Sequence, residues 1–219
     1  MLDFILSKMN LLILVTAIFA IVSFFTFGLT DITKVNEAGA VASRIAEKSF
    51  ALVSSPNYCF SDRYVLDNEI MVAGSGYYYV LKISKTAVIP QNSISGEPVN
   101  VVVFSVYPRT EIKNQYGDSS YAAKAIAADS FRTEAEIHLY SQTYNGTTYE
   151  DAIQEQDELY VDPQAQIPFN SVEFIKEVDE GQPKLYIIAC NSATCLANKT
   201  FVGNMVHPEQ PDGSGGFRC

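Results

Sequence analysis

The sequence predicts an α+β protein with a long amino-terminal helix, apolar in its first half and amphipathic in its second, followed by a mainly antiparallel, sandwich-like β domain. Two observations lead to this prediction. Met9 to Thr30 is uncharged and runs directly into a helical pattern that ends only at Pro56. After Pro56, β-branched and aromatic residues alternate with polar ones at period two, which is typical of strands. We therefore expect a helix over residues 1–55 and an exterior domain over residues 56–219.

The first half of the helix contains the apolar span, residues 11–29, which carries no charge. At about 1.5 Å per residue, a helix of this length approaches the hydrocarbon thickness of a bilayer. The span is too long for the apolar core of a signal peptide, and no small-x-small cleavage site follows it closely. The sequence therefore predicts an uncleaved membrane anchor.

The second half of the helix places small or apolar residues at alternating spacings of three and four, which is the pattern of a packed helix face. Small side chains let helix backbones approach closely. This face could lie on the core of its own domain or against identical helices, and its continuity with the apolar span favours identical helices. The positions expected to pack are Leu11, Leu14, Ile18, Ile21, Phe25, Val35, Ala38, Gly39, Ala42, Ile45, Ser49 and Leu52.

The remainder of the chain reads as strands and turns. The clearest hairpin joins the last two predicted strands, with Gly181 supplying the turn. An Ala-rich piece, residues 121–128, predicts a short helix, and the Pro/Gly/Ser-rich tail, residues 208–216, predicts a loop. The candidate strands are residues 64–72, 77–84, 99–107, 133–141, 158–161, 171–178 and 184–190.

Charge and composition place the domain outside the cell. The net charge is −10, and Asp3 and Lys8 cancel, so the acidic excess lies after the apolar span. Such a domain is repelled by nucleic acid, which we exclude as a partner. Basic residues just after the span favour an inside domain. An even number of cysteines, two glycosylation sequons at Asn145 and Asn198, and a Lys-poor, Tyr/Ser/Thr/Asn-rich composition favour outside, which is our prediction.

The cysteines predict two disulfides. Cys190 and Cys195 flank a short segment just after a predicted strand, so a local bridge is expected. That leaves Cys59 to pair with Cys219, a bridge that would fix the Gly-rich tail. A metal site is the rival interpretation, but the chain lacks a Cys-x-x-Cys pair and its two histidines lack ligand spacing.

No motif marks an enzyme or a cofactor site. His138 falls on the polar face of a predicted strand and His207 lies in a predicted loop, both of which favour surface positions. An acidic cluster at residues 150–162 lacks the residue order of a helix-loop-helix calcium site, so a solvated loop is favoured over a weak calcium site. Tyr77-Tyr78-Tyr79 puts rings on both faces of a strand, so at least one is exposed, at an interface or at a sheet edge.

This plan resembles archaeal type IV pilins and pilin-like proteins, in which an apolar amino-terminal helix continues as an amphipathic helix and carries an exterior β domain. The resemblance rests on residues 11–29, on the small-residue stretch over residues 35–46 and on the β-rich remainder. It does not include a prepilin cleavage motif, because Lys8 is followed by Met9-Asn10 rather than by Gly or Ala. The resemblance implies a non-enzymatic subunit of an extracellular adhesion filament, a homo-oligomer that sits in the membrane before assembly. The alternative is a single-span anchored ectodomain that binds a ligand or protein partner without polymerising.

Overall fold

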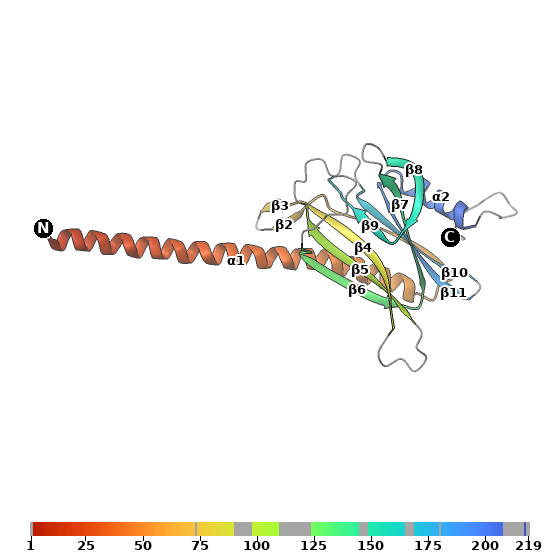
Figure 1. Ribbon diagram of the computed structural model, residues 1–219, viewed down its shortest axis with the longest axis horizontal. Coiled ribbons are helices and arrows are strands. Elements are labelled where there is room, and N and C mark those ends of the chain that lie inside the picture. Colours follow the sequence, from red (N-terminus) through yellow and green to blue (C-terminus); the bar gives the residue numbers. More distant parts are fainter. Residues whose placement is uncertain are drawn as a thin grey trace.

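The protein is represented by a computed structural model, which describes residues 2–72, 74–89, 98–109, 124–144, 149–164, 169–179, 181–207 and 217. Helix α1, Leu2–Ser54, is one continuous helix. Figure 1 shows that it projects alone over its first half and lies along the β domain over its second half. Pro56 follows its last turn, where the lack of a backbone donor and the restriction on the preceding residue end a helix. The predicted helix boundary is therefore confirmed.

The domain contains eleven strands in three sheets within the described residues, followed by one helix. The strands are β1 Cys59–Val65, β2 Ile70–Val72, β3 Ser75–Tyr77, β4 Tyr79–Val88, β5 Val99–Pro108, β6 Ala127–Thr133, β7 Glu136–Tyr144, β8 Tyr149–Gln156, β9 Glu158–Val161, β10 Ser171–Asp179 and β11 Gln182–Cys190, and the helix is α2, Cys195–Val206. The sheet orders are β1-β10-β11-β7-β8, β6-β5-β4-β9 and β2-β3. Only the pairing of β7 with β11 is parallel among these ladders, so the predicted, mostly antiparallel α+β fold is confirmed.

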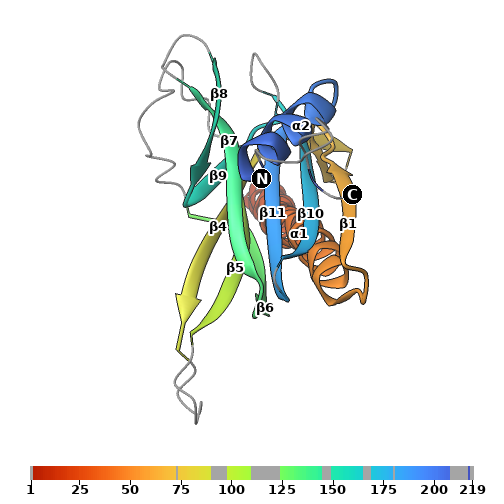
Figure 2. The ribbon, with the colours of Figure 1, turned by 90° about the vertical axis from the view of Figure 1, so that its right-hand side faces the viewer.

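The two large sheets meet at one edge and are separated by α1 at the other (Figure 2). Strands β8 and β9 follow each other with Asp157 between them, and the backbone N–H of Lys85 donates to the carbonyl of Asp157 over 3.3 Å. At the edge where the two sheets are apart, α1 packs against β5 and β6 of one sheet and against β1 and β10 of the other. The helix thus closes one side of the core between the two sheets. The term sandwich, which names only the sheets, therefore describes this domain incompletely.

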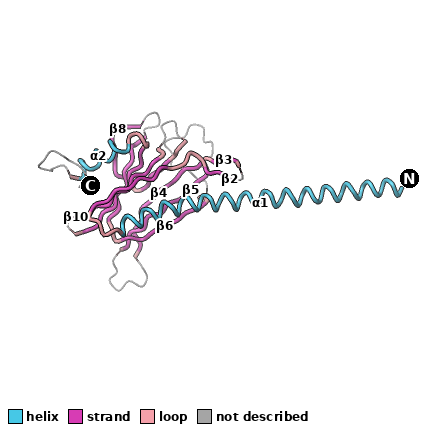
Figure 3. Tube along the Cα trace, turned by 180° about the vertical axis from the view of Figure 1, so that it is seen from behind, coloured by secondary structure: helices cyan, strands magenta, loops and turns pink. Residues whose placement is uncertain are grey.

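One apolar cluster unites α1 with both large sheets. The rings of Phe104 on β5 and Phe174 on β10 lie 6.4 Å apart, edge to face. Ala135, Ile137 and Leu139 are buried on one face of the chain entering β7, as their alternation predicts. Burial of this shared core fixes the second half of α1 rigidly to the domain, and Figure 3 shows the helix running beneath the strands before it leaves them.

Several local predictions need correction. The predicted strand over residues 64–72 is divided between β1 and β2, because the chain turns where Leu66 N–H donates to the Asn170 carbonyl. The predicted helix over residues 121–128 is wrong where the structure describes it, since β6 begins at Ala127 and pairs with β5. Alanine's preference for helix is a weak local signal that sheet pairing overrides. The tail over residues 208–216 lies outside the described residues.

The predicted hairpin is confirmed. Strands β10 and β11 pair antiparallel along their full lengths, from Ser171 with Cys190 to Asp179 with Gln182. Gly181 lies in the turn with a φ of +82°, a conformation that glycine adopts without the steric cost that a Cβ imposes.

Candidate functional site: the projecting half of helix α1

The most unusual surface of the protein is the projecting stem, which we define as residues 8–35 of α1. The large apolar side chains that the structure describes from Met9 to Leu29, which leave out residue 27, are 42% to 77% exposed. Contiguous apolar surface beyond a few hundred Å² is rare on soluble proteins and marks a surface that binds protein or membrane. The helix is long and apolar enough to cross a membrane, and none of its most apolar window is covered by the domain. The stem is therefore suited to an apolar environment that the chain itself does not provide.

The threonines of the stem bond back to the helix. The hydroxyls of Thr16, Thr26, Thr30 and Thr33 each donate to a backbone carbonyl three or four residues earlier, at 2.8 to 3.0 Å. A hydroxyl moved from water into an apolar medium without a partner is costly. Because these four hydroxyls are satisfied within the helix, the stem can enter lipid or a packed helix bundle without leaving them unpaired.

The predicted packing positions divide into two groups. Ala38, Ala42, Ile45, Ser49 and Leu52 are at most 3% exposed, and their neighbours are the sheets of the same chain. The exposed positions are Leu11, Leu14, Ile18, Ile21, Phe25 and Val35. The expectation that the small-residue stretch packs on identical helices is wrong for the buried positions, because the chain's own domain already covers them.

Gly39 belongs with the domain-facing group. It is partly buried, and a Cβ built on it would lie 3.9 Å from the Cβ of Ala127 on β6. This is an ordinary contact distance, so a small residue here accommodates the close approach of α1 to its own sheet.

The two groups point to different sides of the helix. At 100° per residue, Leu11, Leu14, Ile18, Ile21 and Phe25 fall within an arc of about 80°, and the buried positions centre about 140° away. The domain therefore holds the second half of α1 by one side, and the arc of predicted packing positions on the uncovered stem lies on a different side of the helix.

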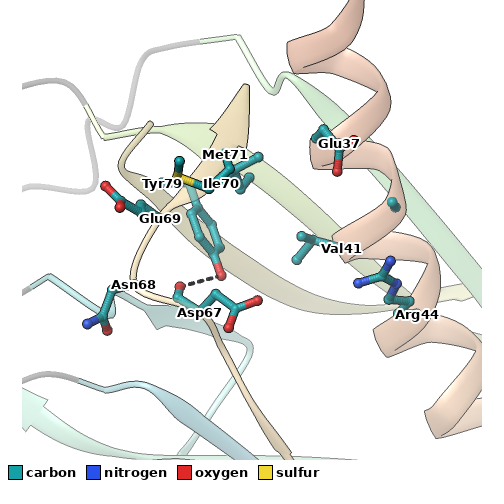
Figure 4. A pocket seen from close by; sticks show the side chains of 10 residues that line it. Glu37, Val41, Arg44, Asp67, Asn68, Glu69, Ile70, Met71 and Tyr79 are labelled. Carbon is teal, nitrogen blue, oxygen red and sulfur yellow. Dashed lines mark hydrogen bonds between the residues drawn. The ribbon is translucent and has the colours of Figure 1, made fainter. Parts of the chain in front are cut away.

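The stem leaves the domain beside the β2–β3 hairpin. The ammonium of Lys34 lies 4.0 Å from the ring centroid of Tyr77 on β3, a cation–π contact. Next to it, a pocket of about 430 Å³ opens between α1 and the segment leading into β2. In Figure 4, Glu37 and Arg44 extend from the helix on one wall, and the other wall carries Asp67 and Tyr79.

The Tyr79 hydroxyl anchors that second wall. It donates to the Asp67 carbonyl over 2.9 Å, and burial raises the pKa of this hydroxyl. The bond fixes the turn between β1 and β2 from within the core, so the hairpin beside the stem has a defined position.

Three further contacts fix the helix to the domain. The ammonium of Lys48 forms an ion pair with Asp62 at 3.0 Å and donates to the Arg63 carbonyl at 2.6 Å. Lys176 on β10 donates to the carbonyl of Ser55, just after α1, and burial lowers the pKa of this lysine. The last turn of α1 has no basic residue, so Lys176 supplies the positive charge that a helix carboxyl end favours. The sequence shows the lysines but not their partners, because each contact joins α1 or its carboxyl end to a strand of the domain, β1 or β10.

The disulfide predictions are partly confirmed. Cys190 and Cys195 are bonded and connect the end of β11 to the start of α2. Cys59 is also disulfide-bonded. Cys219 lies outside the described residues, so the Cys59–Cys219 pairing stays a prediction.

The two sequons differ in what the structure describes. Asn145 lies outside the described residues. Asn198 lies in α2 and is 6% exposed, and its amide nitrogen is fully covered without a hydrogen-bond partner among the described residues. The folded domain has no room for a glycan on that nitrogen, so this half of the glycosylation prediction is not supported.

Both histidines are partly buried and pair with acids, rather than standing free on the surface. His138 stacks on Tyr186 at 5.0 Å and lies 3.1 Å from Glu155. Burial opposes the charged form of Glu155, but hydrogen bonds from Lys85 and His138 outweigh it and lower the pKa of this carboxyl. His207 follows the last turn of α2 and lies 2.6 Å from the buried Glu177.

The described carboxylates of the acidic cluster pair with several cations, and the side chains of Glu150 and Asp151 lie outside the described part of the structure. Glu158 pairs with Lys82 at 2.7 Å, and Asp162 pairs with Arg109 at 3.0 Å. Asp157 lies 3.9 Å from the ammonium of Lys85. These carboxylates therefore form separate ion pairs with cations on β4 and just after β5. Within the described part of the chain, no group of acids, histidines and cysteines gathers as metal ligands.

Comparisons with protein-family models, with curated proteins and with solved structures found no match. The fold and the surface chemistry are therefore the basis for any functional inference.

Proposed function

We propose that this chain is a structural subunit of a pilin-like extracellular filament, held in a membrane by its stem before assembly. One observation carries the proposal. A single continuous helix is buried against its own domain over its second half and fully uncovered over its apolar first half. Copies of such a chain can bundle their stems into a core and display their β domains outside.

The helix also gives the stem a fixed direction relative to the domain. Ala42 and Ile45 are 0% exposed in the shared core. Lys48 and Lys176 fix the end of α1 through one ion pair and two hydrogen bonds to backbone carbonyls. Regular polymers require each copy to present the same surface in the same orientation. A stem that continues a helix embedded in the domain core meets this requirement better than one joined by a flexible linker.

The stabilisation available from stem burial is large. Full burial of one Leu, Ile or Phe side chain contributes roughly 1.5–3 kcal/mol relative to exposure in water. In the membrane the stem is already out of water, so assembly exchanges lipid contacts for helix contacts and depends on close packing. The arc of Leu11, Leu14, Ile18, Ile21 and Phe25 is the proposed contact face, because these positions share one side of the helix at the spacing of three and four that packed helices use.

The alternative is an anchored ectodomain that remains a monomer. The same apolar span supports it, since one helix of this length suffices to anchor a protein. The two proposals differ in whether the side chains of the apolar arc must have particular sizes. A lipid-facing helix tolerates any apolar side chain, whereas a helix–helix contact depends on side-chain volume.

The experiment uses the full chain, purified in detergent and examined by electron microscopy after detergent removal, with and without lipid. We expect filaments from the unmodified chain. Leu14→Ala and Ile18→Ala keep the span apolar, so membrane insertion should persist while filaments shorten or disappear. Phe60→Ala, at a side chain that is 42% exposed on the domain, is the matched control and should assemble normally. A chain that inserts in bilayers yet never forms filaments at any lipid ratio would support the anchored monomer instead.

A further inference from the structure

The β2–β3 hairpin lies against the stem at the end of the apolar span. Figure 1 shows the hairpin beside α1, pointing toward the amino-terminal end of the helix. Ile70 and Val72 face the core, whereas Met71, in register with Gly76, is 56% exposed on the outer face. The hairpin therefore places an exposed apolar side chain next to the exposed apolar helix.

The position of this hairpin along the helix is set by the contact between Lys34 and Tyr77. Lys34 is five residues beyond Leu29, the last residue of the apolar span, which corresponds to about 7.5 Å along the helix axis. The polar layer on each side of a bilayer's hydrocarbon core is roughly 5–8 Å thick. If the span occupies the hydrocarbon, the Lys34 ammonium and the Tyr77 ring are therefore at the level of the lipid headgroups.

The side chains at this level have the chemistry of that layer. Tyrosine is enriched at membrane–water interfaces, because its ring is apolar and its hydroxyl is polar. Tyr78 follows Tyr77 and is 51% exposed, and Met71 adds a flexible apolar side chain. Lys34 lies just beyond the apolar span, where a lysine can bury its apolar stem and keep its ammonium among polar groups. Glu69 lies across Gly76 on the outer face, and its charge disfavours anionic lipid.

From this geometry we propose that the β2–β3 hairpin is a membrane-docking surface. Met71 and Tyr78 rest in the headgroup layer of a zwitterionic bilayer, whereas Tyr77, in register with Ile70, packs against the core and holds the hairpin beside Lys34. The contact with lipid orients the domain relative to the membrane before assembly. The proposal rests on the membrane-anchored state of the proposed function and does not require that the chain polymerises. Tyr78 lies between β3 and β4 and its ring is exposed on the domain. In this proposal the ring contacts the lipid headgroups.

Fluorescence depth measurement tests this proposal directly, because the chain contains no tryptophan. The full chain is reconstituted at low density in phosphatidylcholine vesicles that carry a quenching spin label either on the headgroup or deep in the acyl chain. Met71→Trp and Tyr78→Trp should be quenched at least twofold more by the headgroup label than by the deep label. Tyr58→Trp, at a 79% exposed position beyond the far end of α1, is the control and should respond to neither label.

An internal reference separates the failure of this proposal from the failure of anchoring. Ile18→Trp, in the middle of the span, should be quenched by the deep label. If it is not, the stem does not span the bilayer, and both the anchored state and the docking surface are wrong. If Ile18→Trp responds while both hairpin tryptophans behave like Tyr58→Trp, the hairpin does not touch lipid, and this proposal alone is overturned. If the hairpin tryptophans become shielded from solvent only at high protein density, the hairpin contacts a second copy rather than lipid, and the proposal is also overturned.

Discussion

The two halves of α1 should respond in opposite ways to substitution. Ala42 is 0% exposed and packs in the domain core, whereas Ile18 is 52% exposed on the stem. Ala42→Leu adds three carbon atoms to a filled space, and overpacking of this kind costs about 1–3 kcal/mol. For a domain of this size, each kcal/mol lowers the Tm by roughly 2–4 °C, so the midpoint should fall by roughly 2–12 °C. Ile18→Ala should leave that midpoint unchanged.

Circular dichroism melts of the detergent-solubilised chain measure the first effect, and filament yield by electron microscopy measures the second. Ile18→Ala should lower filament yield, because a deleted Ile side chain at a packed contact costs about 2–5 kcal/mol. Ala42→Leu should lower filament yield only in proportion to the loss of folded domain. A normal melt for Ala42→Leu, combined with defective filaments, would refute the assignment of the small-residue stretch to the domain core. It would restore that stretch as a contact between copies.

Three smaller predictions concern the domain. Lys176→Met removes the donor to the partly buried Ser55 carbonyl, and the loss of this charged donor should cost about 1–3 kcal/mol in urea unfolding. Gly181→Ala places a Cβ at a φ of +82°, which should cost roughly 1–2 kcal/mol in the same assay, whereas Gly39→Ala should be tolerated. The hydrogen bond from Lys82 lowers the pKa of Glu158. The stabilisation from this ion pair is complete above the pKa of Glu158 in the unfolded chain and is lost as pH falls through the lower pKa of the folded protein. The Tm should therefore drop below about pH 4.5. The drop should be smaller in Glu158→Gln, which has no carboxylate to protonate at this position.

The sequence alone determined the long helix, its end near Pro56 and the change to strands, because these features depend on local periodicity and on proline. The apolar span over residues 11–29 could also be predicted, since it depends only on composition. The hairpin at Gly181 and the local bridge between Cys190 and Cys195 were also predictable, because both partners lie close together in the chain. Helix α2 was missed, since Cys195–Val206 carries little amphipathic periodicity and no side-chain cap.

Only the tertiary structure decided what the small-residue stretch contacts. An apolar face looks the same in sequence whether it packs on its own sheets or on a neighbouring helix, because both contacts require small residues at helical spacing. Ala38 and Ala42 are buried in the shared core, and α1 packs there on β5 and β6, strands that lie far away in sequence. The same holds for the position of Tyr77 over Lys34, where two residues distant in the chain meet at the end of the apolar span. Local patterns thus defined the stem, and long-range packing determined which part of α1 is covered by the domain and which part stays open to a partner.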